Sequence, residues 1–175
     1  MVARRAALSE AEHAAFSARM VEHLQAHLRC PEIFAFCWPV KHEPDVRAVV
    51  GTWAGHGARA TLPVVVEPDE PLAFREWTPA TRLVPDRYGI PTPADGAWLV
   101  PELILLPLNG FDAAGYRLGY GGGFFDRTLA ALHPRPLAVG VGFEINRLPS
   151  IRPESHDQRL DWIVTEAGAV RPVNA

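Results

Sequence analysis

The stretch that decides the fold reads Leu103-Ile-Leu-Leu-Pro107-Leu-Asn-Gly-Phe111-Asp-Ala-Ala-Gly115-Tyr-Arg-Leu-Gly119-Tyr-Gly-Gly-Gly123-Phe-Phe-Asp126-Arg127. Residues 103–106 are continuously apolar, which is typical of a strand that is covered on both faces of a sheet. A glycine-rich loop follows, and then a helix is expected near residues 122–132. Because strand, loop and helix come in this order, the stretch predicts one unit of an α/β fold.

The chain before this stretch alternates in the same way. Ser9 and Glu12 have the spacing of a capping box, and apolar residues at four-residue steps (Phe16, Met20, Leu24 and Leu28) predict an amphipathic helix of about five turns. An aromatic-rich run at 33–38 predicts a buried strand that Pro39 ends. Pro44 fits the first turn of a second helix, closed by Gly55 and Gly57.

Further strands are expected at 59–66, 138–143 and 161–165, with a more exposed one at 72–77, whereas the proline-rich segment 81–98 predicts an irregular loop. Together these elements predict a single domain over residues 1–175. Its fold class is α/β, an open, largely parallel sheet with helices on both faces. Ligands of such sheets bind beyond the carboxyl ends of the strands, which directs attention to the loop after residue 106.

Composition excludes several classes of function. The net charge of −3 gives no basic excess for nucleic acid or an anionic membrane. The longest apolar runs are far shorter than a membrane span, and the first residues lack the apolar core of an export signal. We therefore expect a cytoplasmic, reduced protein. A monomer is expected as well, although no feature of the sequence determines the oligomeric state. Cys30 and Cys37 have no zinc-site spacing, so both are expected to be buried small hydrophobic residues.

The glycine-rich loop has the features of a phosphate site. Glycines at 119, 121, 122 and 123 keep side chains away, so backbone N–H groups can converge on an anion beside a helix N-terminus. Arg117 can donate a forked pair of hydrogen bonds to phosphate oxygens. Asp126 supplies an oxygen ligand where Mg²⁺ on those phosphates would be held. For the glycines alone, a tight structural loop is the alternative; the strand before them, the helix after them, Arg117 and Asp126 favour the site.

Generic nucleotide motifs fit this loop poorly. The loop has no Gly-Lys-Ser/Thr sequence, so it is not a Walker loop, and Phe124 replaces the third glycine of a dinucleotide fingerprint.

The segment from Gly115 to Arg127 resembles the signature of the 5-formyltetrahydrofolate cyclo-ligase (methenyltetrahydrofolate synthetase) family, commonly G-x-R-L-G-x-G-x-G-x-Y-D. The flanking segments at 38–46, 62–64, 88–93, 139–143 and 156–166 resemble that family in the same order. The resemblance therefore covers roughly residues 5–170. It implies a fold shared with ribose-5-phosphate isomerase-like and CoA-transferase-like proteins.

The resemblance also implies a reaction and its site. ATP and Mg²⁺ would drive conversion of 5-formyltetrahydrofolate, a reduced folate, to 5,10-methenyltetrahydrofolate with release of ADP and phosphate. Arg117 and Asp126 would be catalytic, Glu43 and Phe125 would bind folate, and Asp126 and Asp157 would bind the metal. The residues that bind ATP would be Gly115, Arg117, Gly119, Tyr120, Gly121, Gly122 and Gly123. Alternatively, Glu43 is a solvated residue and Asp157 caps a turn.

This chain departs from the family pattern at three places. The family's N-terminal element, Lys-x-x-x-Arg or Lys-x-x-Leu-Arg, is missing; Arg4 and Arg5 are the basic residues nearby, and the only lysine is Lys41. Phe125 stands where a Tyr is usual, which removes a hydroxyl but keeps the ring. Val46 stands where a Thr is usual. These departures leave open a divergent, non-catalytic member that binds folate or nucleotide. A sugar-phosphate isomerase on the same fold is a third hypothesis, for which the sequence has no signature.

Overall fold

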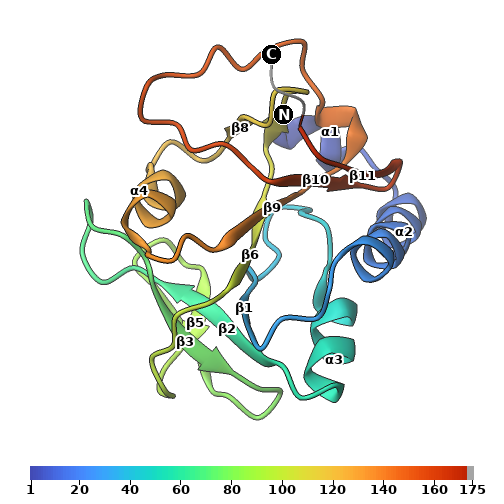
Figure 1. The fold of residues 1–175 in the computed structure, drawn as a ribbon. Helices are drawn as coiled ribbons and strands as arrows, with labels where there is room; N and C mark the ends of the chain where they lie inside the picture. The colour runs from blue at the N-terminus through green and yellow to red at the C-terminus, as the bar shows by residue number, and fades with distance from the viewer. Residues whose placement is uncertain (173–175) are drawn as a thin grey trace.

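The computed structural model describes residues 1–172, and a seven-stranded sheet forms its centre (Figure 1). The strand order is β11-β10-β9-β6-β1-β2-β3. The strands are β1 (Ile33–Ala35), β2 (Arg59–Val64), β3 (Ala73–Trp77), β6 (Leu103–Pro107), β9 (Leu137–Val141), β10 (Trp162–Thr165) and β11 (Gly168–Val170). Neighbours from β10 to β2 are parallel, and the two edge strands are antiparallel. The prediction of an open, largely parallel sheet is confirmed.

Helices cover both faces of this sheet, as predicted. Figure 1 shows α2 (Glu10–His27) and α3 (Arg47–Gly55) on one side and α4 (Phe124–Ala131) on the other. The side chains of β6 alternate between the two layers. Leu103 and Leu105 belong to the core that contains residues of α2 and α3, whereas Ile104 and Leu106 pack in the core that contains Leu129 of α4. The continuous apolar run is therefore explained by burial on both faces.

The long helix α2 begins as its sequence predicts. The Ser9 hydroxyl accepts a hydrogen bond from the backbone N–H of Glu12 at 3.3 Å, and the Glu12 carboxylate accepts one from the backbone N–H of Ser9 at 2.9 Å. These two bonds satisfy N–H groups that a helix start leaves without partners. Met20 and Leu24 are fully buried. The four-residue apolar pattern is therefore core packing.

The prediction of an irregular loop over residues 81–98 is wrong in part. This segment contains a two-stranded antiparallel hairpin, β4 (Leu83–Pro85) paired with β5 (Pro91–Pro93). The Asp86 carboxylate accepts hydrogen bonds from the backbone N–H groups of Tyr88 and Ile90, and Gly89 adopts a φ of +76°. This Asx-type turn closes the hairpin because Asp accepts locally and Gly tolerates positive φ.

Several elements begin or end at other residues than predicted, and several short elements were not predicted. The strand expected at 33–38 ends at Ala35, the strand expected at 59–66 ends at Val64, and α3 starts at Arg47 rather than near Pro44. The structure adds α1 (Val2–Ala6), a short 3-10 helix (Glu144–Asn146), β11, and a small hairpin of β7 (Gly110–Phe111) and β8 (Arg117–Leu118). Elements of two to five residues carry too few positions to show a hydrophobic period.

The two cysteines differ in exposure, which corrects the expectation that both are buried. Cys30 is exposed, whereas Cys37 is partly buried. Burial raises the pKa of the Cys37 thiol well above its usual range, and the nearby Glu43 carboxylate adds to that effect. Cys30 lies just after α2, where the chain runs over the surface.

The sheet reverses its winding between β1 and β6. From β1 the chain passes through α3 to β2 on one side, and β6 later pairs with β1 on its other side. The loops that follow β1 and β6 consequently leave the carboxyl end of the sheet in different directions. The crevice at such a switch point is where open α/β sheets bind ligands. Within residues 1–172 no helix has the length and apolar character to cross a membrane.

Candidate functional site at the switch point

The glycine-rich loop, residues 108–123, leads from β6 to α4 and is anchored by short-range bonds. Asn109 N–H donates to the Leu118 carbonyl at 3.0 Å, and Asp112 N–H donates to the Tyr116 carbonyl at 3.1 Å. The Asp112 carboxylate accepts from the N–H groups of Tyr116 and Ile151. These bonds fix the base of the loop, so the glycines at 119–123 extend from a rigid support.

The glycines at the end of the loop keep its backbone open. Gly121 and Gly123 have φ values of +88° and +63°, which favour glycine. A Cβ added at Gly119 or Gly121 would meet no atom within 4 Å. In the described part of the chain, no backbone or side-chain acceptor takes a hydrogen bond from the N–H groups of residues 119–123. Five successive N–H donors are therefore available to an anion at the start of α4.

Gly115 has a different environment from these glycines. A Cβ at this position would lie 2.7 Å from Pro172, and its φ is +93°. Gly115 therefore permits close packing of the loop against the end of the chain. Its predicted contact with ATP stays a prediction.

The two side chains predicted to be catalytic form an ion pair. Arg117 Nη2 lies 3.1 Å from Asp126 Oδ1, and the two side chains are 5% and 19% exposed. Arg117 Nη1 donates to the Gln158 carbonyl at 2.9 Å, and Gln158 N–H donates to Asp126 Oδ1 at 2.8 Å. The start of α4, β8 and the segment before β10 are thus held together at Asp126. The guanidinium holds the carboxylate in place at the loop.

Asp157, the second predicted metal ligand, is the residue before Gln158, so its chain segment passes next to Asp126. Its Oδ2 accepts a hydrogen bond from the backbone N–H of Glu154 at 2.7 Å, which is the turn-capping role that its sequence allowed as an alternative. Residues 1–172 contain no group of three or more His, Cys, Asp or Glu side chains arranged around a metal position. The two carboxylates do not by themselves make a complete metal site.

Glu43 and Tyr120, from the loops after β1 and β6, contact each other at the switch point. The Tyr120 hydroxyl donates to Glu43 Oε1 at 2.6 Å, and Val40 N–H donates to Oε2 at 3.1 Å. Glu43 is 4% exposed, so the alternative that it is a solvated residue is wrong. Burial raises the pKa of Glu43, while the bonds from Tyr120 and Val40 and the charge of Arg5 act in the opposite direction. Burial and Glu43 raise the pKa of Tyr120 to about 12.

Arg5 and Asn109 complete this cluster, and the sequence pattern did not assign them to it. Arg5 is fully buried, and its Nη1 donates to Asn109 Oδ1 at 2.6 Å. Its Nη2 donates to the Tyr120 hydroxyl at 2.6 Å, and its Nε donates to the Lys41 carbonyl at 2.7 Å. An arginine near the N-terminus of a sequence gives no sign of burial, so only the tertiary structure reveals this role of Arg5.

Aromatic and basic side chains border the same region. The Lys41 ammonium lies 4.8 Å from the centre of the Tyr120 ring, which is an exposed cation–π contact. Phe125 is partly buried against the core on the α4 face. The neighbouring Phe124 ring lies 6.0 Å from Tyr88, at the tip of the β4–β5 hairpin. The hairpin therefore reaches the start of α4.

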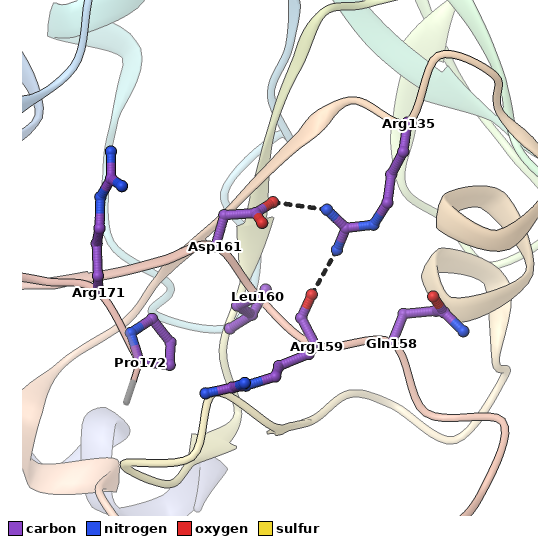
Figure 2. A pocket seen from close by; sticks show the side chains of 7 residues that line it. All are labelled: Arg135, Gln158, Arg159, Leu160, Asp161, Arg171 and Pro172. Atoms are coloured by element: carbon purple, nitrogen blue, oxygen red, sulfur yellow. Dashed lines mark hydrogen bonds and ion pairs between the residues drawn. The ribbon is translucent and has the colours of Figure 1, made fainter. Parts of the chain in front are cut away.

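A separate shallow cavity of about 430 Å³ lies beside β10 (Figure 2). Arg135 and Asp161 point toward each other there and form an ion pair at 2.7 Å. The cavity is lined by Arg135, Gln158, Arg159, Leu160, Asp161, Arg171 and Pro172. None of the predicted site residues lines it, so we place the candidate site at the switch point and not in this cavity.

The fold defines an α/β protein with a glycine-rich loop at the switch point of its sheet. The family model described as the 5-formyltetrahydrofolate cyclo-ligase family matches residues 1–166, and the chain belongs to this family. The family resemblance of the sequence is thereby confirmed.

Two bacterial relatives illustrate the similarity. The 5-formyltetrahydrofolate cyclo-ligase of Mycolicibacterium smegmatis is 33% identical over 137 residues, which cover 73% of this chain and 70% of that protein. The protein of the same name from Escherichia coli K12 is 34% identical over 131 residues, 70% and 71% of the two chains.

Two solved structures share the fold. The 5,10-methenyltetrahydrofolate synthetase of Aquifex aeolicus superposes with a TM-score of 0.82 at 26% identity, covering 99% of this chain and 90% of that one. The synthetase of Mycoplasma pneumoniae superposes with a TM-score of 0.78 at 23% identity, covering 94% and 93%, and supports the fold alone. The likeness to ribose-5-phosphate isomerase-like proteins stays a prediction.

Proposed function

We propose that this chain is an ATP- and Mg²⁺-dependent ligase that converts 5-formyltetrahydrofolate to 5,10-methenyltetrahydrofolate and releases ADP and phosphate. The observation that carries the proposal is the 2.6 Å hydrogen bond between Tyr120 and Glu43. It joins the loop with free N–H donors to a buried carboxylate at the switch point. A phosphate-binding element and a folate-binding acid would then share one crevice, as transfer between the two substrates requires.

The glycine-rich loop would bind the phosphates of ATP. The N–H groups of residues 119–123 have no acceptor in the described chain, and α4 adds its N-terminal partial positive charge. Mg²⁺ commonly takes one or two carboxylates together with phosphate oxygens and water, so a pair such as Asp126 and Asp157 fits its needs. The ion would neutralise charge on the transferred phosphoryl group. Arg117 would hold Asp126 in place through its ion pair.

The reduced folate would bind on the Glu43 side of the crevice. A carboxylate can accept hydrogen bonds from the amino and ring N–H groups of a pterin edge. Each oxygen of Glu43 accepts one protein hydrogen bond, which leaves acceptor capacity for a ligand. Phe125 offers an aromatic ring at the start of α4, where a flat ligand ring can pack.

The reaction needs positioning more than covalent participation by the protein. The formyl oxygen on N5 attacks the γ-phosphorus of ATP, and the bond to ADP breaks. N10 then adds to the activated formyl carbon, N10 loses its proton, and the C–O bond breaks as phosphate leaves. Phosphoryl transfer of this kind depends on alignment and charge neutralisation, which the N–H donors and the residues around Asp126 can provide. All proposed site residues belong to one chain, so a monomer suffices.

A second candidate is a member that binds folate or nucleotide without turnover. The ion pair between Arg117 and Asp126 favours it, because both predicted catalytic side chains are already occupied by each other. Phe125 also lacks the hydroxyl usual at its position in the family. This candidate predicts saturable binding with no product.

The test is the formation of the methenyl product, followed by its near-ultraviolet absorbance. The purified chain is mixed with 5-formyltetrahydrofolate, ATP and Mg²⁺, and each component is omitted in turn. We expect a rate that requires all three. Absence of product with intact folate binding by calorimetry would overturn the ligase and support the second candidate.

A further inference from the structure

The side chain of Arg5 is buried and lies against Tyr120 and Glu43. Resting on the proposed function, we propose that Arg5 is a positioning residue for the reduced folate, acting through Tyr120 and Glu43, and that it does not bind the phosphates of ATP. Arg5 is fully buried, and each of its three guanidinium nitrogens donates to a protein oxygen. No nitrogen of this group is left without a protein partner.

The contacts of Arg5 tie together the loops on both sides of the switch point. Its bond to the Lys41 carbonyl reaches the loop after β1, and its bonds to Asn109 and Tyr120 reach the loop after β6. The Tyr120 hydroxyl accepts from Arg5 and donates to Glu43, both at 2.6 Å, so it relays the position of Arg5 to the carboxylate. A planar guanidinium donates to these three oxygens in one fixed geometry, whereas an ammonium is a compact point charge on a flexible stem.

The direct charge interaction supports the same role. Arg5 Nη2 lies 3.7 Å from Glu43 Oε1, and both side chains are almost inaccessible to solvent. Burial favours the neutral acid, whereas the charges of Arg5 and Lys41 favour the carboxylate. Removing Arg5 would therefore raise the pKa of Glu43 further, because one of the charges that oppose the effect of burial is lost.

The remaining titratable groups around Glu43 do not replace this charge. Cys37, after β1, is neutral because burial and Glu43 raise its pKa. His13 of α2 reaches the Glu43 backbone carbonyl at 2.9 Å and not its carboxylate. Tyr120 is a neutral donor with a raised pKa. Lys41 is exposed and lies over the Tyr120 ring, so water screens its charge.

The experiment compares Arg5→Met and Arg5→Lys with Arg29→Met, which removes an exposed arginine after α2. Calorimetry measures the Kd of 5-formyltetrahydrofolate and, separately, of Mg²⁺–ATP. We expect Arg5→Met to raise the folate Kd about ten- to a hundredfold, which is the range that loss of a hydrogen bond to a charged group produces. The ATP Kd should rise less than about twofold. The folate Kd of Arg5→Lys should lie between those of wild type and Arg5→Met, and the folate Kd of Arg29→Met should match that of wild type.

The pH dependence of folate binding separates positioning from a merely structural role. If an ionised Glu43 is needed, the acid limb of binding lies at its raised pKa, and loss of Arg5 moves that limb to higher pH. An unchanged limb, or a selective loss of ATP binding, would overturn the proposal. If wild type itself binds no folate, the proposed function and this inference both fail, whereas equal folate binding by wild type and Arg5→Met defeats the inference alone.

A double variant keeps the test valid if Arg5→Met does not fold. Arg5→Met combined with Glu43→Gln removes both members of the buried pair, so no isolated charge remains. We expect the double variant to bind folate no more weakly than Glu43→Gln alone, because Arg5 acts through Glu43. An additive loss would show that Arg5 acts independently, and would contradict the proposal.

Discussion

The hydroxyl of Tyr120 offers a sharp test of the crevice, because a single oxygen atom bridges Arg5 and Glu43. Tyr120→Phe removes two hydrogen bonds of 2.6 Å and leaves the ring in place. Hydrogen bonds to charged partners contribute about 1.5–3 kcal/mol each, and a group left unpaired adds to the loss. Tyr120 is 50% exposed, so water can replace part of the contact. We therefore expect a loss of about 2 kcal/mol in the free energy of unfolding.

Thermal and urea unfolding would measure this loss. For a chain of this size, about 2 kcal/mol corresponds to a fall in Tm of roughly 4–8 °C. Tyr116→Phe is the matched control, since the Tyr116 hydroxyl makes no hydrogen bond within residues 1–172. A Tyr120→Phe variant within about 0.5 kcal/mol of wild type, like an ordinary surface change, would refute the bridging role.

Three further predictions follow from other contacts. The pKa of Glu43 is raised, so the folded protein holds the Glu43 proton more tightly than the unfolded chain does. The stability that this proton contributes is present below the unfolded pKa of 4.5 and is lost as pH rises through the folded pKa. The pH-dependent unfolding of Glu43→Gln should lack this loss. Arg117→Ala should weaken ATP more than folate, because it releases Asp126 at the phosphate loop; equal calorimetric losses would make Arg117 purely structural. Thr128→Val should cost about 1–3 kcal/mol in urea unfolding, since the buried N–H of Leu72 loses its acceptor.

The parts of the fold that the sequence predicted correctly are those with a strong local signal. Ser9 and Glu12 mark a helix start through bonds only three residues apart, and that start is confirmed. Residues 103–106 show burial on both faces because every residue in the run is apolar, and they form the central strand β6. The helix start is decided by local hydrogen bonds. The strand is recognisable whatever residues pack against it, because its whole run is apolar.

The missed elements are too short to show a periodic pattern. The β4–β5 hairpin is rich in proline, which argues against regular structure, but Asp86 and Gly89 close a turn that pairs its short strands. The edge strand β11 has three residues and pairs with β10 through backbone bonds. Cys30 is exposed because α2 ends just before it, a boundary that composition does not define.

In the candidate site, too, some features were predictable from the sequence and others were not. The glycine loop and its residues Arg117 and Asp126 were predictable from spacing, although their mutual ion pair was not, since the sequence assigned each to an external ligand. Arg5 and Asn109 come from segments 104 residues apart, and only folding brings them within 2.6 Å. The sequence therefore indicated the loop that carries Arg117 and Asp126, whereas the contacts of Arg5 with Asn109 and Tyr120 come from the structure alone; phosphate binding at the loop stays a prediction.

The fate of the formyl oxygen distinguishes phosphorylation of the folate from other routes to the product. 5-Formyltetrahydrofolate labelled with ¹⁸O in the formyl group is converted by the purified chain with ATP and Mg²⁺, and the released phosphate is examined by mass spectrometry. Phosphorylation of the formyl oxygen predicts that the label appears in phosphate as the methenyl product forms. Methenyl product with unlabelled phosphate would contradict phosphorylation of the formyl oxygen, and no product at all would contradict the ligase.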